Sequence, residues 1–150
     1  MGHTFTNNLY HIVFSTKSRQ PYLLPALRER IFKYMYGVAV NKSGTPLAIN
    51  GIEDHVHMLV MIKPDMPVSK FVGDVKANAS RWISETFPEV RDFSWQAGYS
   101  SFTVSESKRD EVCRYIANQQ EHHKDKSFAD ELAFLLKKNK IAFDPRDCLG

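Results

Sequence analysis

The sequence predicts an α+β protein built as one domain, and three observations lead to this prediction. Short segments rich in β-branched and aromatic residues alternate with longer segments whose apolar residues recur at helical spacing. Turn-forming Pro and Gly residues separate many of these segments. No internal repeat, low-complexity tract or linker interrupts the 150 residues, a length that suits a single domain. We therefore treat residues 1–150 as one domain.

The first half of the chain predicts a strand, a helix and two further strands. The segments LYHIVFS and HVHMLVMI are rich in β-branched and aromatic residues, which favours strands. Between them, apolar residues recur at the intervals of a helix, and Lys42-Ser43-Gly44 ends that pattern. The expected strands are residues 9–15, 47–52 and 55–62, and the expected helix is residues 26–41.

The second half predicts an amphipathic helix, a strand and two more helices. Gly98 is expected to interrupt the strand. Ser107 can cap the helix after it, because Asp110 follows three residues later as in a capping box. The expected elements are a helix at 68–86, a strand at 95–104, a helix from 107 to about 123, and a helix at 128–138.

The predicted order of the elements is β-α-β-β-α-β followed by two helices. The first six elements match the split βαβ arrangement known as ferredoxin-like. This arrangement pairs the strands into an antiparallel sheet with helices on one face, and we expect the opposite face, or its mouth, to stay free for a ligand. Because such a fold supports many functions, the function must be inferred from a site.

Composition and charge narrow the class of protein only modestly. Hydrophobic residues make up 43% of the chain and charged residues 25%, as in ordinary globular proteins. The net charge of +3 and the pI near 8.8 are compatible with nucleic acid as a partner. No segment has the run of about 18 apolar residues that a membrane helix needs, and residues 1–8 lack a signal-like apolar core. We therefore expect a cytoplasmic protein, in which Cys113 and Cys148 are free thiols.

The first chemical signal is the run Asp54-His55-Val56-His57. Residues two apart on a strand point to the same side, so His55 and His57 project together. Two imidazoles on one strand can hold a divalent metal with a third ligand from elsewhere. Most histidine pairs at this spacing are surface or hydrogen-bonded residues. The apolar residues that follow this pair place it at the end of a buried strand. Burying polar side chains is costly unless they have partners, and this favours a metal site.

The second signal is Tyr115, which shares a helical face with Gln119 one turn later. A tyrosine on an apolar stripe is most often part of a core, but an apolar core does not favour a glutamine. Gln119 offers an amide oxygen that suits Mg²⁺ or Mn²⁺, and Tyr115 offers a phenol as nucleophile. Asn118 points elsewhere and is a weaker ligand candidate. His122 and His123 are expected to be exposed rather than catalytic, and a contact with phosphate is the alternative role for them.

Two histidines, a glutamine and a tyrosine together suit phosphoryl transfer. The metal would polarise and orient a phosphate. Tyr115 would attack that phosphate, displace a 3′ hydroxyl and leave a 5′-phosphotyrosine link that conserves bond energy for rejoining. A free phenol titrates near 10, so a base must assist, and the sequence does not identify it. These residues predict an enzyme that cuts and rejoins single-stranded DNA.

With these residues in place, the sequence resembles the single-tyrosine transposases of the insertion-sequence 200/605 family, within the HUH endonuclease superfamily. The resemblance covers nearly the whole chain and rests on the segments YHIVFSTKSRQPYL, GIEDHVHMLV, FVGDVKANASRWI, WQAGYSSFTVS and YIANQQEHH. It implies His55 and His57 as the HUH metal ligands, Gln119 as the third protein ligand and Tyr115 as the nucleophile. Relatives that process repetitive extragenic palindromes share this chemistry, so a mobile element and a domesticated enzyme both stay open.

The resemblance also implies partners. These are DNA hairpins near the element ends, and a homodimer in which the tyrosine helix of one chain serves the histidines of the other. The short connection between Val104 and Ser107 points the same way, because it leaves the helix little freedom to fold back over its own sheet. Basic and aromatic side chains are the expected contacts to single strands, and the candidates are Arg19, Lys76, Arg81 and Tyr99.

Two other functions stay open at this point. A non-catalytic nucleic-acid-binding module on the same scaffold explains the pI and the aromatic residues, but it leaves Tyr115 and Gln119 on one face by accident. A metal-dependent nuclease that uses water as nucleophile explains the two histidines, but it gives Tyr115 no role.

Overall fold

A computed structural model describes residues 2–148, and it contains a four-stranded antiparallel sheet. The strands lie in the order β2-β3-β1-β4, which is the order of the split βαβ arrangement. The predicted α+β fold is therefore confirmed. The strands are β1 (Leu9–Ser15), β2 (Gly44–Gly51), β3 (His55–Ile62) and β4 (Ser100–Thr103).

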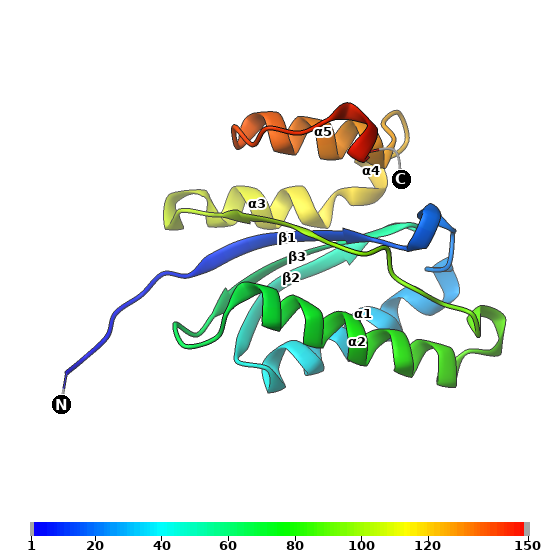
Figure 1. Ribbon diagram of the computed structural model, residues 1–150, viewed down its shortest axis with the longest axis horizontal. Coiled ribbons are helices and arrows are strands. Elements are labelled where there is room, and N and C mark those ends of the chain that lie inside the picture. The colour runs from blue at the N-terminus through cyan, green and yellow to red at the C-terminus, as the bar shows by residue number, and fades with distance from the viewer. Residues whose placement is uncertain (1, 149–150) are drawn as a thin grey trace.

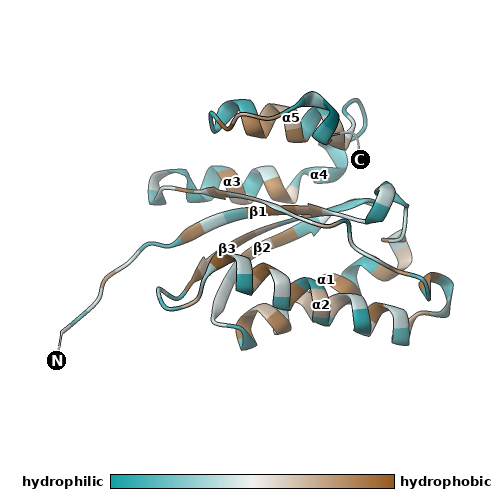
Figure 2. Ribbon diagram, viewed as in Figure 1, coloured by the Kyte–Doolittle hydropathy of each residue, from teal (hydrophilic) through white to brown (hydrophobic). Residues whose placement is uncertain are grey.

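Two long helices, α1 (Pro25–Asn41) and α2 (Val68–Thr86), cover one face of this sheet (Figure 1). Their apolar residues pack against the strands and form the main core, in which Ile31 and Phe71 are fully buried with Met58. Figure 2 shows hydrophobic residues along these two helices and along the strands beside them. The apolar residues that recur at helical spacing in both segments therefore face the sheet, as an amphipathic helix requires.

The other face of the sheet is covered as well, so the prediction of a free ligand face is wrong. The C-terminal helices lie over it (Figure 1), where Ile116 packs with Leu9 and Leu59, and Phe128 packs with Val13. The reason lies in β1 and β3, which are buried on both faces and are therefore nearly continuous apolar runs. The helices on this face are α3 (Arg109–Ala117), α4 (Gln119–His122) and α5 (Phe128–Lys138).

Two strands, β2 and β4, differ from the prediction in where they begin and end. β2 begins at Gly44, three residues earlier than expected. Ser43 has a φ of 73° there, and this left-handed turn leads the chain from α1 almost directly into the strand. β4 is limited to Ser100–Thr103, because the chain breaks at Gly98 (φ 88°) and only an isolated bridge joins Trp95 to Thr16.

The helix predicted from Ser107 to about His123 is divided into a 3-10 turn, α3 and α4, with a break at Asn118. The Ser107 hydroxyl does not cap α3 and instead lies 2.8 Å from the Ser105 hydroxyl. A serine cap is found at α5, where Ser127 accepts a hydrogen bond from the backbone of Asp130 (3.2 Å). The 3-10 turns are Lys17–Arg19, Pro88–Val90, Glu106–Lys108 and Pro145–Cys148.

The end of α3 is tied to β2 of the same chain. The Asn50 side-chain amide donates to the last two carbonyls of α3, at 2.9 and 3.2 Å, which the helix end leaves without intrahelical partners. Gln120 donates to the Asn50 side chain (3.2 Å) and to the Gly51 carbonyl (3.1 Å). The tyrosine helix therefore does fold back over its own sheet, and the contrary expectation from the short connection is wrong.

Two expectations from composition can be compared with the described residues. Cys113 is half-buried, Cys148 is buried, and both are free thiols as predicted. Among residues 2–148, no helix has both the length and the apolar character required to span a membrane.

Gly51 is expected to be essential for the turn that presents the histidine strand. A Cβ atom at Gly51 would lie 2.1 Å from the backbone carbonyl oxygen of His55, so Gly51→Ala should lower the free energy of unfolding by about 1–3 kcal/mol. Chemical denaturation measures this change. Gly73→Ala on α2 is the matched control, because its Cβ meets open space and alanine favours a helix by about 0.5–1 kcal/mol. Equal stability of Gly51→Ala and the wild type would contradict this packing.

Candidate metal and nucleophile site

His55 and His57 stand at the start of β3 and point toward the C-terminal helices. Val56 and Met58 alternate with them and point into the main core, as the two-residue period predicts. Both imidazoles are fully buried, with 0% of each residue exposed. Buried polar rings need hydrogen-bond partners, and here the partners define the site.

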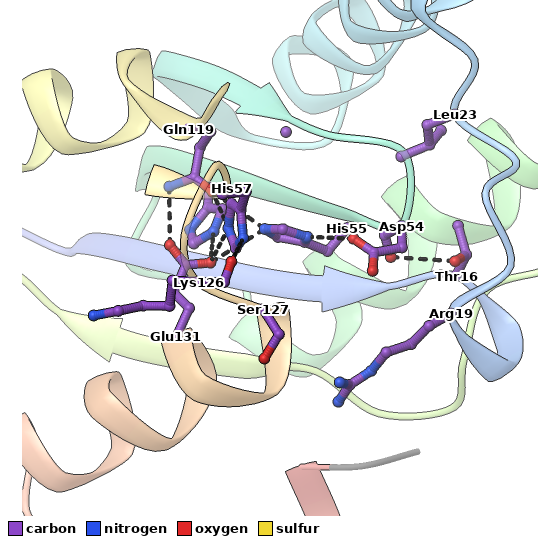
Figure 3. Close-up of polar contacts among 12 residues, drawn as sticks. Thr16, Arg19, Leu23, Asp54, His55, His57, Gln119, Lys126, Ser127 and Glu131 are labelled. Atoms are coloured by element: carbon purple, nitrogen blue, oxygen red, sulfur yellow. Dashed lines mark hydrogen bonds and ion pairs between the residues drawn. The ribbon is translucent and has the colours of Figure 1, made fainter. Parts of the chain in front are cut away.

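Glu131 of α5 supplies the central partner. Its carboxylate is 1% exposed, and its Oε1 atom lies 3.1 Å from Nε2 of His55 and 3.0 Å from Nε2 of His57. Nε2 of His123 lies 3.0 Å from the same oxygen. Figure 3 shows Glu131 and Gln119 beside His57, with His55 extending from this group toward Asp54. One buried oxygen thus meets three imidazole nitrogens.

The other carboxylate oxygen of Glu131 faces the tyrosine. Oε2 accepts hydrogen bonds from the hydroxyl of Tyr115 and from Nε2 of Gln119 (3.0 Å). Gln119 is fully buried, and its Oε1 atom lies 3.1 Å from Nε2 of His55. The carboxylate therefore joins the imidazole group to the phenol, with one oxygen on each side.

The outer nitrogens of the two strand histidines also have partners. Nδ1 of His55 lies 2.7 Å from Oδ1 of Asp54. Nδ1 of His57 lies 2.8 Å from Nε2 of His11, a buried histidine on the neighbouring strand β1. Metal-binding histidines usually have such a partner on the ring nitrogen that does not bind the metal, because the partner fixes the tautomer and the ring orientation.

Burial and neighbouring charges shift the pKa values of these histidines in different directions. Burial, and then the neighbouring His57, lower the pKa of His11 to about 3. Burial also lowers the pKa of His57 to about 4, against the opposing effect of Glu131. The pKa of His55 is raised, because its hydrogen bonds to Asp54 and Glu131 together outweigh the large effect of burial.

The pKa values of the acid and the phenol move apart. Burial alone would raise the pKa of Glu131, but hydrogen bonds from His123, His55 and His57 hold it far below its usual value. Burial, followed by the hydrogen bond to Glu131 and its charge, raises the pKa of Tyr115 far above its usual value. In this arrangement the carboxylate is ionised and the phenol keeps its proton.

The donor atoms at this site fit a divalent metal. One ligand atom each from His55, His57 and Glu131 lie within 4.8 Å of one another, and the amide oxygen of Gln119 is adjacent. Imidazole nitrogen with carboxylate and amide oxygen suits metals such as Mn²⁺, and the oxygens suit Mg²⁺. The metal site expected from the sequence therefore has a fitting set of donor groups.

The structure brings together His55, His57, Gln119 and Tyr115, the four residues singled out from the sequence. It also adds Glu131, which the sequence analysis missed. Its signal was present, because Glu131 shares one face of its helix with Phe128 and Leu135. A charged residue in an apolar stripe needs a partner.

Two further histidines were missed or misjudged. His123 was expected to be exposed, but its side chain is 4% exposed and contacts both Glu131 and Gln119. Its spacing of four residues after Gln119 was the available signal. His11 interrupts the apolar run of β1, which is the same kind of signal on a strand.

The four DNA-contact candidates do not form one group. Arg19 and Tyr99 line a cavity of about 250 Å³ together with Phe128, whose ring stacks on His55 at 4.2 Å. Lys76 donates to the carbonyls of Gln96 and Gly98 and lines an adjacent hollow with Tyr99. Arg81 is exposed on α2 and donates to Asn78. Arg19 and Tyr99 thus share a cavity with Phe128, the residue whose ring stacks on His55.

Comparison with known proteins identifies the family to which this fold belongs. The family model described as IS200-like transposase matches residues 4–119. The transposase of insertion sequence IS200 from Salmonella typhimurium is 32% identical over 130 residues, which cover 83% of this chain and 84% of that protein. The ISDra2 transposase TnpA of Deinococcus radiodurans is 24% identical over 115 residues, covering 73% of this chain and 82% of that protein.

Two solved structures share the fold. A transposase crystal structure from Deinococcus radiodurans R1 has a TM-score of 0.65 and 25% identity, covering 79% of this chain and 96% of that chain. A REP-associated tyrosine transposase bound to a REP hairpin has a TM-score of 0.61 and 12% identity, covering 82% of this chain and 73% of that chain. The chain belongs to the IS200-like transposase family.

The two histidines with lowered pKa values predict that the metal-free protein loses stability in mild acid. Their folded-state pKa values of about 3 and 4 lie below the unfolded value of 6.5. Their contribution is therefore fully present above pH 6.5 and is lost as the pH falls. Between pH 6.5 and 5, each should lower the free energy of unfolding by up to about 1.4 kcal/mol per pH unit. His55, whose pKa is raised, contributes in the opposite sense only above pH 6.5.

Denaturant unfolding of protein treated with EDTA measures this dependence. His11→Gln keeps a hydrogen-bonding side chain but cannot titrate, so the slope between pH 6.5 and 5 should fall by about half. An unchanged slope in this variant would show that His11 does not resist protonation in the folded protein.

Proposed function

We propose that this transposase cuts and rejoins single-stranded DNA, with Tyr115 as nucleophile and a divalent metal beside it. The observation that carries the proposal is that Tyr115, Gln119 and both strand histidines meet at the buried carboxylate of Glu131. Burying so many polar groups costs more stability than filling the same space with apolar side chains. A catalytic role explains why these groups are together, and membership of a transposase family supports it.

The proposed metal is Mg²⁺ or Mn²⁺, held by His55, His57 and Glu131 with the amide oxygen of Gln119. Bound there, the metal would polarise a non-bridging oxygen of the scissile phosphate and offset its negative charge. The carboxylates of Asp54 and Glu131 both face these imidazoles, and their charge favours a cation at this position.

Cleavage transfers the scissile phosphorus from a 3′ oxygen of DNA to the Tyr115 hydroxyl oxygen. The new bond joins this oxygen to phosphorus, the bond from phosphorus to the 3′ oxygen breaks, and the 3′ oxygen takes up a proton. Oε2 of Glu131 accepts the hydrogen bond from the phenol, so we propose that it orients the hydroxyl, and that the phenolic proton passes to water as the new bond forms. Rejoining reverses these changes, because a 3′ hydroxyl attacks the 5′-phosphotyrosine and the phenol regains its proton.

The DNA strand is proposed to approach along the cavity lined by Arg19, Tyr99 and Phe128. This cavity adjoins His55 through the stacked ring of Phe128. A guanidinium suits a phosphate and an exposed tyrosine suits stacking with a base, and Tyr99 is 41% exposed. A hairpin is the proposed form of the wider DNA target, since the REP-associated structure with this fold holds one.

The two alternative functions explain less of this geometry. A non-catalytic binding module does not require Tyr115 to contact the carboxylate that also contacts the histidines. A nuclease that uses water has no role for the phenol inside the site. The tyrosine therefore distinguishes the proposed function from both alternatives.

A homodimer with shared sites stays a prediction, and the structure of one chain supplies a competing arrangement. Tyr115 reaches the site of its own chain, where its ring lies 5.9 Å from that of His57. The carboxylate it contacts belongs to the same chain. One chain therefore supplies all the residues of the proposed site without a helix from a partner subunit.

Tyr115→Phe should abolish cleavage and the covalent adduct while leaving the fold and DNA binding intact, because it removes only the hydroxyl. The measurement uses labelled single strands with Mn²⁺ or Mg²⁺ and a denaturing gel. A tyrosine nucleophile gives an adduct that survives denaturation, a water-dependent nuclease gives free cut strands, and a binding module gives neither.

The controls for this measurement are EDTA and His57→Ala, each of which should stop cleavage through loss of the metal. An adduct that persists in Tyr115→Phe would falsify the assignment of the nucleophile. Cleavage that continues in EDTA would remove the metal from the proposal.

Mixing His57→Ala with Tyr115→Phe protein tests whether the tyrosine acts within its own chain. Each variant is inactive alone, and every chain in the mixture lacks one essential residue. The geometry of the single chain predicts that the mixture stays inactive even when subunits are shown to exchange. Recovered cleavage, with DNA attached only to the His57→Ala chain, would show a dimer in which the tyrosine serves the partner subunit.

A further inference from the structure

His123 lies inside the proposed metal site. It directly follows α4, the short helix that comes after the tyrosine helix α3. Its side chain is 4% exposed, and its ring lies 4.6 Å from the ring of His55. Its Nε2 atom is 3.0 Å from Oε1 of Glu131 and 3.2 Å from Oε1 of Gln119. The same atom of His55 faces the same two oxygens, each at 3.1 Å.

The opposite nitrogen of His123 fixes which form of the ring is present. Nδ1 lies 2.6 Å from the backbone carbonyl oxygen of Lys126, and a carbonyl oxygen can only accept a hydrogen bond. Nδ1 must therefore carry a proton and donate it. In the neutral ring this leaves the lone pair on Nε2, the atom that faces Glu131 and Gln119.

His123 and His55 are thus held in the same manner. Each ring has Nδ1 against an oxygen acceptor, Lys126 for His123 and Asp54 for His55. This is the usual arrangement of a metal-binding histidine, whose outer nitrogen donates to a carbonyl or a carboxylate. A lone pair facing two oxygen atoms is repelled by them, and either a proton or a cation between these atoms removes the repulsion.

We propose that His123 is a third imidazole ligand of the divalent metal, alongside His55 and His57. This inference rests on the proposed function, because it adds a ligand to the metal that the function requires. The oxygen donors would be Glu131 and Gln119. Since Gln119 and His123 belong to the segment that directly follows Tyr115, two of the ligands would tie the nucleophile-bearing segment to the sheet.

Mn²⁺ binding to the full chain in the absence of DNA tests the proposal. Continuous-wave electron paramagnetic resonance measures the free Mn²⁺ and gives the affinity. Pulsed resonance on protein labelled with ¹⁵N at histidine counts the imidazoles bound to the ion. We expect three bound imidazoles in the wild type and two in His123→Ala, with an affinity lower by ~10-fold or more.

His122→Ala is the matched control, because it removes the neighbouring imidazole, whose ring stacks on Tyr115 instead. Its Mn²⁺ affinity and its imidazole count should equal those of the wild type. Circular dichroism establishes whether each variant is folded. The wild-type count alone decides the matter if His123→Ala does not fold.

Each other outcome overturns the inference. Two bound imidazoles in the wild type would leave His123 outside the metal shell. A weaker affinity in His123→Ala with an unchanged imidazole count would show that His123 only positions Gln119 or Glu131. Wild-type protein that binds no Mn²⁺ would count against the proposed function itself, whereas a count of two leaves that function intact.

Discussion

The buried carboxylate of Glu131 is the interaction on which the arrangement of the site depends. An unpaired carboxylate at 1% exposure would be strongly destabilising, so α5 can dock only where the imidazoles meet it. Apolar clusters around Phe128 and Leu135 bring α5 to the sheet, but apolar contact is not directional. The hydrogen bonds to Glu131 supply the direction. They set where α5 lies relative to β3 and where Tyr115 finds an acceptor.

The main core, on the other face of the sheet, fixes the positions of the polar residues around Glu131. Val56, Met58 and Val60 are buried against α1 and α2, and their alternation forces His55 and His57 onto the other face. A slip of one residue in the pairing of β3 would reverse both sets. Apolar packing on one face of the sheet therefore fixes the positions of the polar residues on the other face. For this reason the rings of His55 and His57, 5.0 Å apart, are positioned by the strand itself and need no loop to hold them.

The sequence predicts the elements and half of the site, and the limits have physical reasons. Strand alternation and helical spacing are local patterns, so the sheet, His55 with His57, and Tyr115 with Gln119 follow from neighbouring residues. Which face α3 and α5 cover depends on contacts between residues far apart in the chain, and the prediction that this face stays free was wrong. The apolar runs of β1 and β3, buried on both faces, were the evidence for it. Glu131 was missed for the same reason, because its partner His57 lies 74 residues earlier in the chain. His123 was missed although its spacing of four residues after Gln119 is a local signal.

The tyrosine helix is fastened to β2 by uncharged groups. Asn50 and Gln120 make these contacts through side-chain amides and backbone carbonyls. Dissolved salt screens interactions between charges, and it weakens the contacts of basic side chains with DNA phosphates steeply. Neutral amides are largely insensitive to it. A change in ionic strength therefore changes the affinity for the DNA strand, while the position of the Tyr115 phenol against the sheet of its own chain stays the same.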